Sequence, residues 1–243
     1  MNLYIVTGTT KGLGQALVAK LAESADNDIV ALARAPDGPI ARGFRFHLDL
    51  ADARAIEAVF DRVEKRISGK TYEKAVLINN AGVVTPVGPL EHVAAEELER
   101  SLLVNLVAPM LLMRRFLLAT DGVALRRIIN ISSGAGRKPY AGWAAYCAGK
   151  AGLDMASRAV ALDAAEHGRK VEVASLAPGV IDTPMQGVVR GAEKADFPEI
   201  GRFKQMKAEG TLRPASDVAA DILRAEAEGK LAGEVVLDLR QLA

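Results

Sequence analysis

The sequence is poor in the residues that cross-link chains or bind metal ions. Cys147 is the only cysteine among 243 residues, so an intrachain disulfide is excluded, as is usual in a reducing compartment. The three histidines, His47, His92 and His167, lie far apart and lack the spacing of metal ligands. We therefore expect a cytoplasmic protein without a metal site.

An excess of one charge and a long hydrophobic run are also missing. The 31 Lys and Arg residues balance 30 Asp and Glu residues, and a formal charge of +1 creates no field that attracts nucleic acid or anionic membranes. The longest apolar stretch, Leu102–Met113, is interrupted by Asn105 and Pro109 and is too short to span a bilayer. The start, MNLYIVTG, has no signal-peptide pattern. These features predict no nucleic-acid or membrane partner.

Half of the residues are hydrophobic, and their periodicity predicts alternating strands and helices. The expected strands are Leu3–Thr7, Ile29–Ala33, Phe44–Leu48, Ala75–Asn79, Leu125–Ser132, Val171–Ala177 and Glu234–Leu239. The expected helices are Gly12–Ser24, Asp52–Ser68, Ala94–Thr120, Ala144–His167 and Ser216–Glu228. This alternation is typical of a single α/β domain, residues 1–243, with a doubly wound parallel sheet and helices on both faces. Ligands bind such sheets at the carboxyl ends of the strands.

Two segments do not fit the alternation. Ala35–Pro39 is rich in proline and glycine and is expected to be a loop. Thr183–Pro214 carries scattered charge, glycine and proline without one clear period. We expect this second segment to be a mobile excursion that covers a substrate.

The first strand leads into a glycine-rich turn, Gly8-Thr9-Thr10-Lys11-Gly12-Leu13-Gly14. Glycines allow a sharp turn and a close approach to a pyrophosphate, which then lies at the helix N-terminus. The spacing is G-x-x-x-G-x-G, which differs from the common dinucleotide fingerprint. A glycine-rich loop alone is a weak signal, but its position between a strand and a helix favours a nucleotide site.

The residue about 20 positions beyond this turn indicates the kind of ribose that is bound. Arg34 stands at that position, no acid occupies Leu32 or Ala33, and Lys11 adds a second cation. Two cations near the adenosine ribose favour NADPH over NADH. The alternatives are that both are solvated loop charges, or that Asp37 is the ribose ligand.

A serine, a tyrosine and a lysine form the candidate catalytic group. Ser133 follows a buried strand, and Tyr146 and Lys150 lie four residues apart on one face of the next helix. A phenol has a reference pKa of ~10, and lowering it to ~7 requires about 4 kcal/mol. We expect the Lys150 ammonium and a cationic nicotinamide ring to supply this stabilisation together. An ordinary helix that carries a Tyr and a Lys is the alternative.

Other polar and aromatic residues have two interpretations. Consecutive asparagines in Asn79-Asn80-Ala81-Gly82 are turn formers or ties between strand ends beside a ribose. Asn105 is a core amide with satisfied hydrogen bonds or part of the site. Trp143 and Tyr140 line a pocket for an aromatic substrate or pack in the core. Cys147 is interpreted as a packing residue.

Taken together, TGTTKGLG, NNAG, Asn105, Ser133 and YCAGK occur in the order and spacing of the short-chain dehydrogenase/reductase family, and the resemblance covers essentially the whole chain. It implies a Rossmann-type fold with a seven-stranded sheet, Tyr146 as acid/base, Lys150 as the group that lowers its pKa and holds the nicotinamide ribose, Ser133 orienting the carbonyl, and Asn105 in a proton relay. With the glycine loop and Arg34, it implies a cofactor site of Gly8, Thr10, Lys11, Gly12, Leu13, Gly14, Arg34, Asp49, Leu50, Asn80, Ala81, Gly82, Tyr146, Lys150, Pro178, Gly179, Val180 and Thr183.

Two segments, INISSGAGRKPYAGWAAYCAGKAGLDM and APGVIDTPMQ, resemble a branch of this family that contains sepiapterin reductase and the bacterial benzil reductases. The resemblance implies an NADPH-dependent carbonyl reductase that acts on a bulky or aromatic α-diketone. It also implies a substrate site of Ser133, Trp143, Tyr146, Met185 and Asp238. Asp238 is the nearest candidate for the pterin anchor of sepiapterin reductase, but its spacing from the preceding glycine is shifted by one residue, which argues against pterin recognition.

Three other functions compete with this prediction: a sepiapterin-type pterin reductase, a non-catalytic NADP-binding regulator, and an NAD-dependent alcohol dehydrogenase. A non-catalytic regulator is expected to lack at least one residue of the Ser–Tyr–Lys trio, whereas this sequence retains Ser133, Tyr146 and Lys150. The apolar faces of Ala94–Thr120 and Ala144–His167 favour a homodimer or homotetramer, unless the sheet covers both faces.

Overall fold

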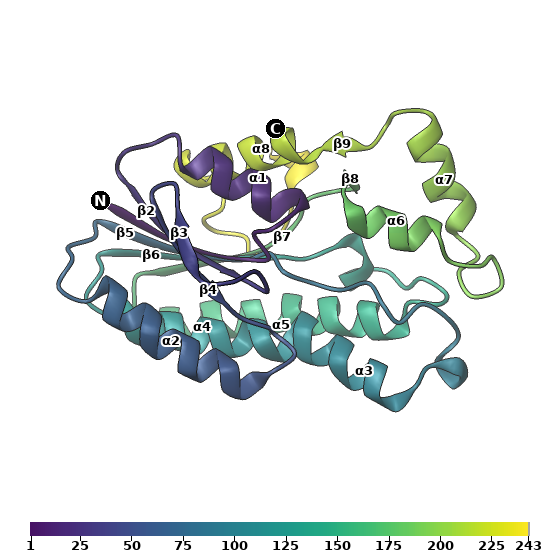
Figure 1. The fold of residues 1–243 in the computed structure, drawn as a ribbon, viewed down its shortest axis with the longest axis horizontal. Coiled ribbons are helices and arrows are strands. Elements are labelled where there is room, and N and C mark those ends of the chain that lie inside the picture. Colours follow the sequence, from purple (N-terminus) through teal and green to yellow (C-terminus); the bar gives the residue numbers. More distant parts are fainter. Residues whose placement is uncertain (243) are drawn as a thin grey trace.

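An eight-stranded sheet forms the centre of the protein, whose computed structural model describes residues 1–242 (Figure 1). The strand order is β10-β7-β6-β5-β1-β2-β4-β3, and all neighbours are parallel except β3 and β4. The strands are β1 (Asn2–Thr7), β2 (Asn27–Ala33), β3 (Gly38–Ile40), β4 (Gly43–His47), β5 (Lys74–Asn79), β6 (Leu125–Ile131), β7 (Val171–Ala177) and β10 (Val236–Asp238). The predicted single-domain, doubly wound α/β fold with seven parallel strands is confirmed.

The eighth strand, β3, was not expected, because the sequence predicts a loop there. Pro39 pairs with Phe44 of β4 in an antiparallel hairpin, and Arg42 adopts a φ of 62° in the turn. Proline cannot donate a ladder hydrogen bond, but an edge strand leaves one side unpaired and tolerates it. The proline that indicated a loop is therefore compatible with the outermost strand.

Helices cover both faces of the sheet (Figure 1). On one face lie α1 (Gly12–Leu21) and α8 (Ala215–Ala227), and on the other lie α2 (Ala53–Ile67), α3 (Ala95–Leu102), α4 (Ala108–Ala119) and α5 (Ala144–Glu166). Strand β1 shows the alternation directly: Leu3 and Ile5 pack in the core on the side of α2 and α4, whereas Tyr4 and Val6 pack in the core on the side of α1 and α8.

The helix expected over residues 94–120 is present but contains a π-helical turn, Leu103–Val107, between α3 and α4. Pro109 has no N–H and cannot donate to the carbonyl of Asn105, four residues earlier, so the regular α-helical pattern is interrupted there. The combined helix, Ala95–Ala119, is long and apolar enough to pass a length-and-hydropathy test for a membrane span. In the fold, its Leu112 and Phe116 are fully buried against the sheet.

The segment 183–214 has more regular structure than the sequence predicts. It contains α6 (Pro184–Arg190) and α7 (Ile200–Ala208), and β8 (Ile181–Asp182) pairs with β9 (Arg213–Pro214) at its two ends. Figure 1 shows α6 and α7 beyond the end of the sheet. We call residues 183–214 the covering segment. Its short helices are anchored by one buried side chain in α6 and two in α7 rather than by a continuous apolar stripe, so periodicity does not reveal them.

Candidate active site

A cavity of about 690 Å³ lies at the carboxyl ends of β1, β2, β5, β6 and β7 and is bounded by α6 and α7. All but two of the site residues expected from the sequence line it. The two exceptions are Gly14 and Asn105. The position agrees with the rule that doubly wound sheets bind ligands where the strand order reverses, here around β1.

The glycine loop has a geometry that only glycine allows. Gly8 and Gly12 adopt φ values of 70° and 57°, in the left-handed region. A Cβ atom on Gly14 would lie 2.2 Å from the Gly8 carbonyl oxygen, so this glycine permits α1 to pack closely on the loop. No side chain of residues 1–242 caps the N-terminus of α1. The loop therefore leaves first-turn N–H groups for a phosphate ligand.

The NNAG motif joins the ends of two strands. The hydroxyl of Thr7 accepts hydrogen bonds from the backbone N–H groups of Asn80 and Ala81, each at 2.9 Å. The Asn80 amide donates to the Thr7 carbonyl at 2.8 Å. A Cβ on Gly8 would lie 2.9 Å from the Cα of Ala81, so both loops approach closely. This arrangement fixes the wall beside the glycine loop, where the sequence places a ribose.

Ser133, Tyr146 and Lys150 converge at the other end of the cavity. Ser133 stands just beyond β6, and its hydroxyl accepts a hydrogen bond from the Ala135 N–H at 3.1 Å. Tyr146 and Lys150 project from the same face of α5, with the lysine nitrogen 5.9 Å from the phenol ring centre. The Lys150 ammonium donates to the Ile131 carbonyl at 2.8 Å. The predicted trio is therefore assembled around one point of the cavity wall.

Burial dominates the electrostatics of this trio. It raises the pKa of Tyr146, while a hydrogen bond to Ser133 lowers it and the neighbouring Cys147 adds to the rise. Burial also lowers the pKa of Lys150 to about 8, with the Asp154 carboxylate acting in the opposite direction. The sequence predicts that Lys150 lowers the pKa of Tyr146. That prediction combined Lys150 with a cationic nicotinamide ring and stays a prediction; among the protein groups alone, desolvation of the phenol outweighs the lowering effect of Ser133.

Asn105 lies under the trio rather than in the cavity lining. Its side-chain amide accepts from the Val83 N–H at 3.0 Å and donates to the Val83 carbonyl at 2.8 Å. A Cβ on Gly82 would lie 3.0 Å from the Asn105 amide oxygen and 3.5 Å from the Lys150 nitrogen. Its amide is thus satisfied within the core, as one of the two interpretations expected, and it lies next to Lys150.

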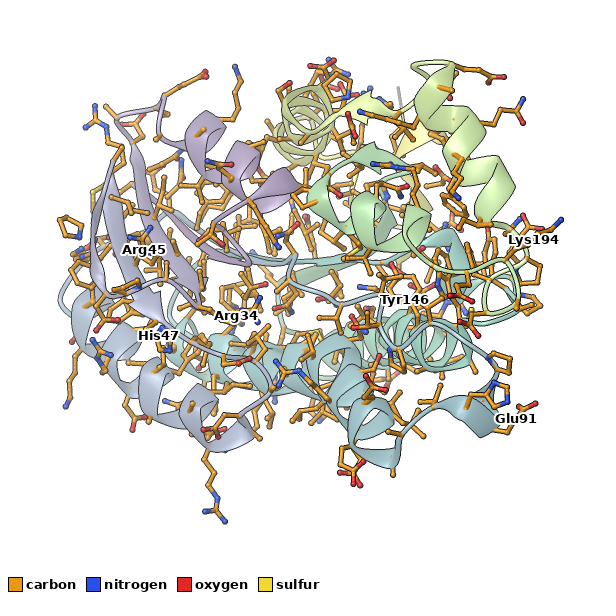
Figure 2. The ribbon with its side chains drawn as sticks, turned by 45° about the vertical axis from the view of Figure 1, so that its right-hand side comes forward. Arg34, Arg45, His47, Glu91, Tyr146 and Lys194 are labelled. Atoms are coloured by element: carbon orange, nitrogen blue, oxygen red, sulfur yellow. The ribbon has the colours of Figure 1, made fainter. Side chains whose placement is uncertain are left out.

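The glycine-loop end of the cavity contains the two cations that were predicted to lie near the adenosine ribose, Lys11 and Arg34. Lys11 and Arg34 both line it, and Figure 2 shows Arg34 near the β2–β4 side of the molecule, far from Tyr146. Asp49 also lines the cavity and lies 3.6 Å from Arg100. Asp37, the alternative ribose ligand, accepts from the His47 N–H and is absent from the cavity lining.

An aromatic cluster lies at the Tyr146 end of the cavity, and all its members except Phe197 line the cavity: Tyr140, Trp143, Tyr146, Phe197 and Phe203. Trp143 stacks on Phe197 of the covering segment, with ring centres 4.4 Å apart, and meets the edge of Tyr146 at 5.3 Å. Since only 5% of Trp143 is exposed, both interpretations apply: it lines the cavity and packs in a core.

Met185 and Asp238, the other predicted substrate residues, also line the cavity. The Asp238 carboxylate accepts from the Arg240 backbone N–H at 3.0 Å and from its guanidinium at 2.9 Å. Arg240 holds the pKa of Asp238 below its usual range. The Asp238 carboxylate, the candidate pterin anchor, is thus already paired with the Arg240 guanidinium.

Several lining residues were missed by the sequence analysis. They are mostly cations and residues of the covering segment: Arg100, Arg137, Lys138, Gln186, Val189, Arg202, Phe203 and Arg240. Arg137 and Lys138 follow Ser133 closely in GRKPY, so their position was a usable signal. The others come from segments whose patterns do not reveal which side chains face the cavity.

Comparisons with known proteins agree with this geometry. A family model described as short chain dehydrogenase matches residues 2–194. The chain is 36% identical over 237 residues to a benzil reductase ((S)-benzoin forming) of Bacillus subtilis, with 97% of each chain covered. It is 30% identical to a sepiapterin reductase of Meriones unguiculatus, with 90% and 88% covered. The crystal structure of the enzyme KRED1-Pglu superimposes with a TM-score of 0.81 at 27% identity, with 93% and 94% covered. The chain therefore belongs to the short-chain dehydrogenase/reductase family and is an oxidoreductase with a nicotinamide cofactor.

Proposed function

We propose that this protein is an NADPH-dependent carbonyl reductase that reduces one carbonyl of a bulky or aromatic α-diketone, with Tyr146 as the proton donor. One observation carries the proposal: a single cavity has the Ser133–Tyr146–Lys150 trio at one end and the cations Lys11 and Arg34 at the other. The resemblance to a benzil reductase over nearly the whole chain supports the same substrate class.

The residues present fit a dinucleotide. The left-handed glycines and the uncapped N-terminus of α1 suit a pyrophosphate, and Gly82 leaves the Lys150 ammonium room to reach a ribose. Arg34 and Lys11 make no ion pair with any carboxylate of residues 1–242, so both are available to a 2′-phosphate. Bound NADPH supplies the hydride that reduces the carbonyl carbon.

The protein groups then manage the proton. Ser133 and Tyr146 donate hydrogen bonds to the carbonyl oxygen and stabilise the negative charge that develops on it. The phenolic O–H bond of Tyr146 breaks as the new O–H bond forms, which leaves a phenolate. The raised pKa keeps Tyr146 protonated before the reaction, so that it enters as an acid. The ammonium of Lys150 stabilises the phenolate that remains.

The route by which Tyr146 regains a proton is also proposed from the fold. Pro109 has no N–H to donate to the Asn105 carbonyl, and the side chains of Asn105 and Lys150 both lie beside Gly82. A water bound at this carbonyl would relay a proton from bulk solvent toward Lys150 and the Tyr146 phenolate. This assigns Asn105 to a proton relay through its backbone rather than its side-chain amide, which Val83 already occupies.

The substrate end favours an aromatic or bulky group. Trp143 and Phe203 present apolar walls beside Tyr146, and Met185 adds a polarizable one. The covering segment closes this end, and we propose that it moves to admit the substrate. Packing of Phe197 on Trp143 would link that movement to the catalytic tyrosine.

The competing functions fit less well. A pterin reductase needs a free anchor, whereas Asp238 is paired with Arg240. A non-catalytic regulator would not require an assembled Ser133, Tyr146 and Lys150. An NAD-dependent alcohol dehydrogenase would not benefit from the cations Lys11 and Arg34.

We also propose that the protein assembles as a homodimer or homotetramer through α4 and α5. The sheet does not cover these helices completely, because Met110, Leu118, Met155 and Leu162 are 47–61% exposed. An apolar face of this kind is stabilised by a second copy. The cytoplasmic location stays a prediction from the sequence.

The first experiment follows NADPH oxidation at its absorbance band with benzil and sepiapterin in parallel, and with NADH as the cofactor control. Turnover of benzil that requires NADPH supports the proposal. Preferential turnover of sepiapterin would transfer the assignment to pterins, and equal rates with NADH would contradict the roles of Lys11 and Arg34.

The Tyr146→Phe variant tests the chemistry separately. It keeps the ring and its packing on Trp143 but removes the proton donor, so we expect kcat to fall by at least ~1000-fold, in the upper range of acid–base catalysis. NADPH affinity, measured by calorimetry, is expected to stay within about threefold because the phenol contributes little to phosphate binding. Turnover that survives in this variant would refute the assigned role.

A further inference from the structure

The active-site cavity is more cationic than the protein as a whole. Eight Lys and Arg residues line it against two acids, although the chain carries a formal charge of only +1. Lys11 and Arg34 are assigned to the cofactor, and Lys150 to catalysis. Arg100, Arg137 and Arg240 each have a carboxylate within 3.6 Å. Two cations, Lys138 and Arg202, remain.

Neither of these two cations is neutralised by the protein. Within the described part of the chain, no carboxylate lies within 4.0 Å of the side-chain nitrogens of Lys138 or Arg202. Both side chains are largely exposed, and a solvated surface charge would explain each of them alone. Their shared position is what distinguishes them from other surface cations.

Lys138 and Arg202 each contact an aromatic ring that neighbours Trp143. The Lys138 nitrogen lies 4.8 Å from the ring centre of Tyr140, which is 5.4 Å from Trp143. The Arg202 guanidinium carbon lies 5.8 Å from the ring centre of Phe203, which is 5.7 Å from Trp143. Each cation is therefore held against one ring by a cation–π contact.

Trp143, which lies near both Tyr140 and Phe203, also neighbours the catalytic Tyr146. Trp143 contacts Tyr146, and Tyr140, Trp143, Tyr146 and Phe203 all line the same cavity. A substrate whose carbonyl meets Tyr146 would lay its side group along this aromatic wall. A side group that lies along Tyr140 or along Phe203 would bring its end near Lys138 or Arg202.

We infer that the substrate is an aromatic α-dicarbonyl compound that carries a carboxylate on its ring, bound through Lys138 or Arg202 at the rim of the cavity. This inference rests on the proposed function, because it assigns a substrate class to the same site. A carboxylate suits both cations: it pairs with the ammonium of a lysine and accepts two hydrogen bonds from an arginine.

The geometry also sets the size of the effect. A rim cation in contact with water contributes less than a buried one, so each pair is expected to change affinity by about 2- to 5-fold. The two cations also attract the anion before it docks, an effect that salt screens over about 8 Å at physiological ionic strength. Together they are expected to favour an anionic substrate by about 5- to 10-fold at low salt.

The test compares two compounds of nearly the same shape: benzil-4-carboxylate and benzil-4-carboxamide. Their kcat/KM values are measured with NADPH for the wild type, for Lys138→Met, for Arg202→Met and for the double variant. Lys194→Met is the matched control, because Lys194 is an exposed cation of the covering segment that does not line the cavity (Figure 2). Calorimetry of both compounds with each protein, in the presence of NADP⁺, measures binding without turnover.

We expect the wild type and the Lys194→Met variant to prefer the carboxylate over the carboxamide by at least ~5-fold at low salt, and the double variant to lose most of that preference. The single variants identify which cation binds the ring that carries the charge. A carboxylate-to-carboxamide ratio near one in the wild type, or a ratio that the double variant does not change, overturns the inference.

Failure of the proposed function would look different. If benzil and both derivatives are not reduced, the diketone-reductase proposal is refuted, and calorimetry still decides the inference. Tighter binding of the carboxylate that Lys138→Met and Arg202→Met abolish would then support an anion site in the cavity. Equal binding of the two compounds would overturn it.

Discussion

Replacing Lys150 with methionine is expected to lower the reductase activity without lowering the stability of the fold. The Lys150 side chain is 4% exposed, and its pKa falls from 10.5 to about 8. A shift of this size means that burial of the charged form costs about 3 kcal/mol of folding free energy at pH 7. Methionine fills a similar volume without a charge, so that cost disappears in the variant.

The loss of one hydrogen bond opposes this gain. The Ile131 carbonyl, which accepts from Lys150 at 2.8 Å, is left without that partner, at a cost of about 1–3 kcal/mol. At pH 7 the variant is therefore expected to be between equal to the wild type and about 2 kcal/mol more stable. Reductase activity is expected to fall by at least ~100-fold, because the charge that stabilises the Tyr146 phenolate is removed.

The pH dependence of stability gives a sharper test, because it reports the effect of the Lys150 charge separately from that of the lost hydrogen bond. The unfolded chain binds the lysine proton more tightly than the folded protein, so wild-type stability rises as pH increases through about 8 toward 10.5. Between pH 7 and pH 9 the loss of the Lys150 proton is expected to raise the free energy of unfolding of the wild type by about 1 kcal/mol. The Lys150→Met variant has no such group and does not gain this stability. The variant's relative stability is thus expected to fall by that amount.

Urea unfolding followed by the fluorescence of Trp143, the only tryptophan, measures these differences at pH 7 and pH 9. Protein concentration is kept constant, because an oligomer gains stability with concentration. Lys170→Met, at an exposed position, is the control and is expected to show no change in relative stability between the two pH values. A Lys150→Met variant that loses more than about 2 kcal/mol at both pH values would refute the desolvation argument.

Two further predictions concern the two ends of the cavity. Replacing both Lys11 and Arg34 with alanine is expected to weaken NADPH binding by at least ~10-fold and to leave NADH binding nearly unchanged, because two charge-assisted contacts to the 2′-phosphate are lost; calorimetry with both cofactors measures this, and equal losses would contradict the assignment. Gly142 adopts a φ of 79°, and a Cβ added there would lie 2.0 Å from the Asp196 carbonyl oxygen, so in the Gly142→Ala variant the covering segment must shift. We expect KM for the diketone to rise and the free energy of unfolding to fall by about 1–3 kcal/mol. Gly201→Ala, where the new methyl meets nothing within 4 Å, is the control, and an unchanged KM in Gly142→Ala would show that the segment does not shape the site.

Local sequence rules predicted most of the cavity because the fold brings strand ends together in a regular way. Ser133 follows a buried strand, and Tyr146 and Lys150 share a helix face by their spacing alone. In a parallel sheet all such strand ends meet at one edge, so the glycine loop after β1 lies beside the asparagines after β5 without further information. Periodicity and position were sufficient for these residues.

The electrostatics of the same residues depended on tertiary packing. Spacing shows that Lys150 can approach Tyr146, but both side chains are buried in the fold, and desolvation is the largest influence on their pKa values. Spacing also left the role of Asn105 open, whereas the fold satisfies its amide through Val83, which is 22 residues away. A polar group's partner across such a separation cannot be read from one sequence.

The substrate end shows the same division most clearly. The sequence by itself determined the α/β sheet, the position of the cavity, the glycine loop and the catalytic trio, because each follows from the short periods of strands and helices. Only the tertiary structure decided that Phe197 and Phe203 stack around Trp143 and that Lys138 and Arg202 flank that cluster. The contacts of Trp143 with Phe197 and Phe203 join residues 54 and 60 positions apart, and packing between such distant residues has no period in the sequence.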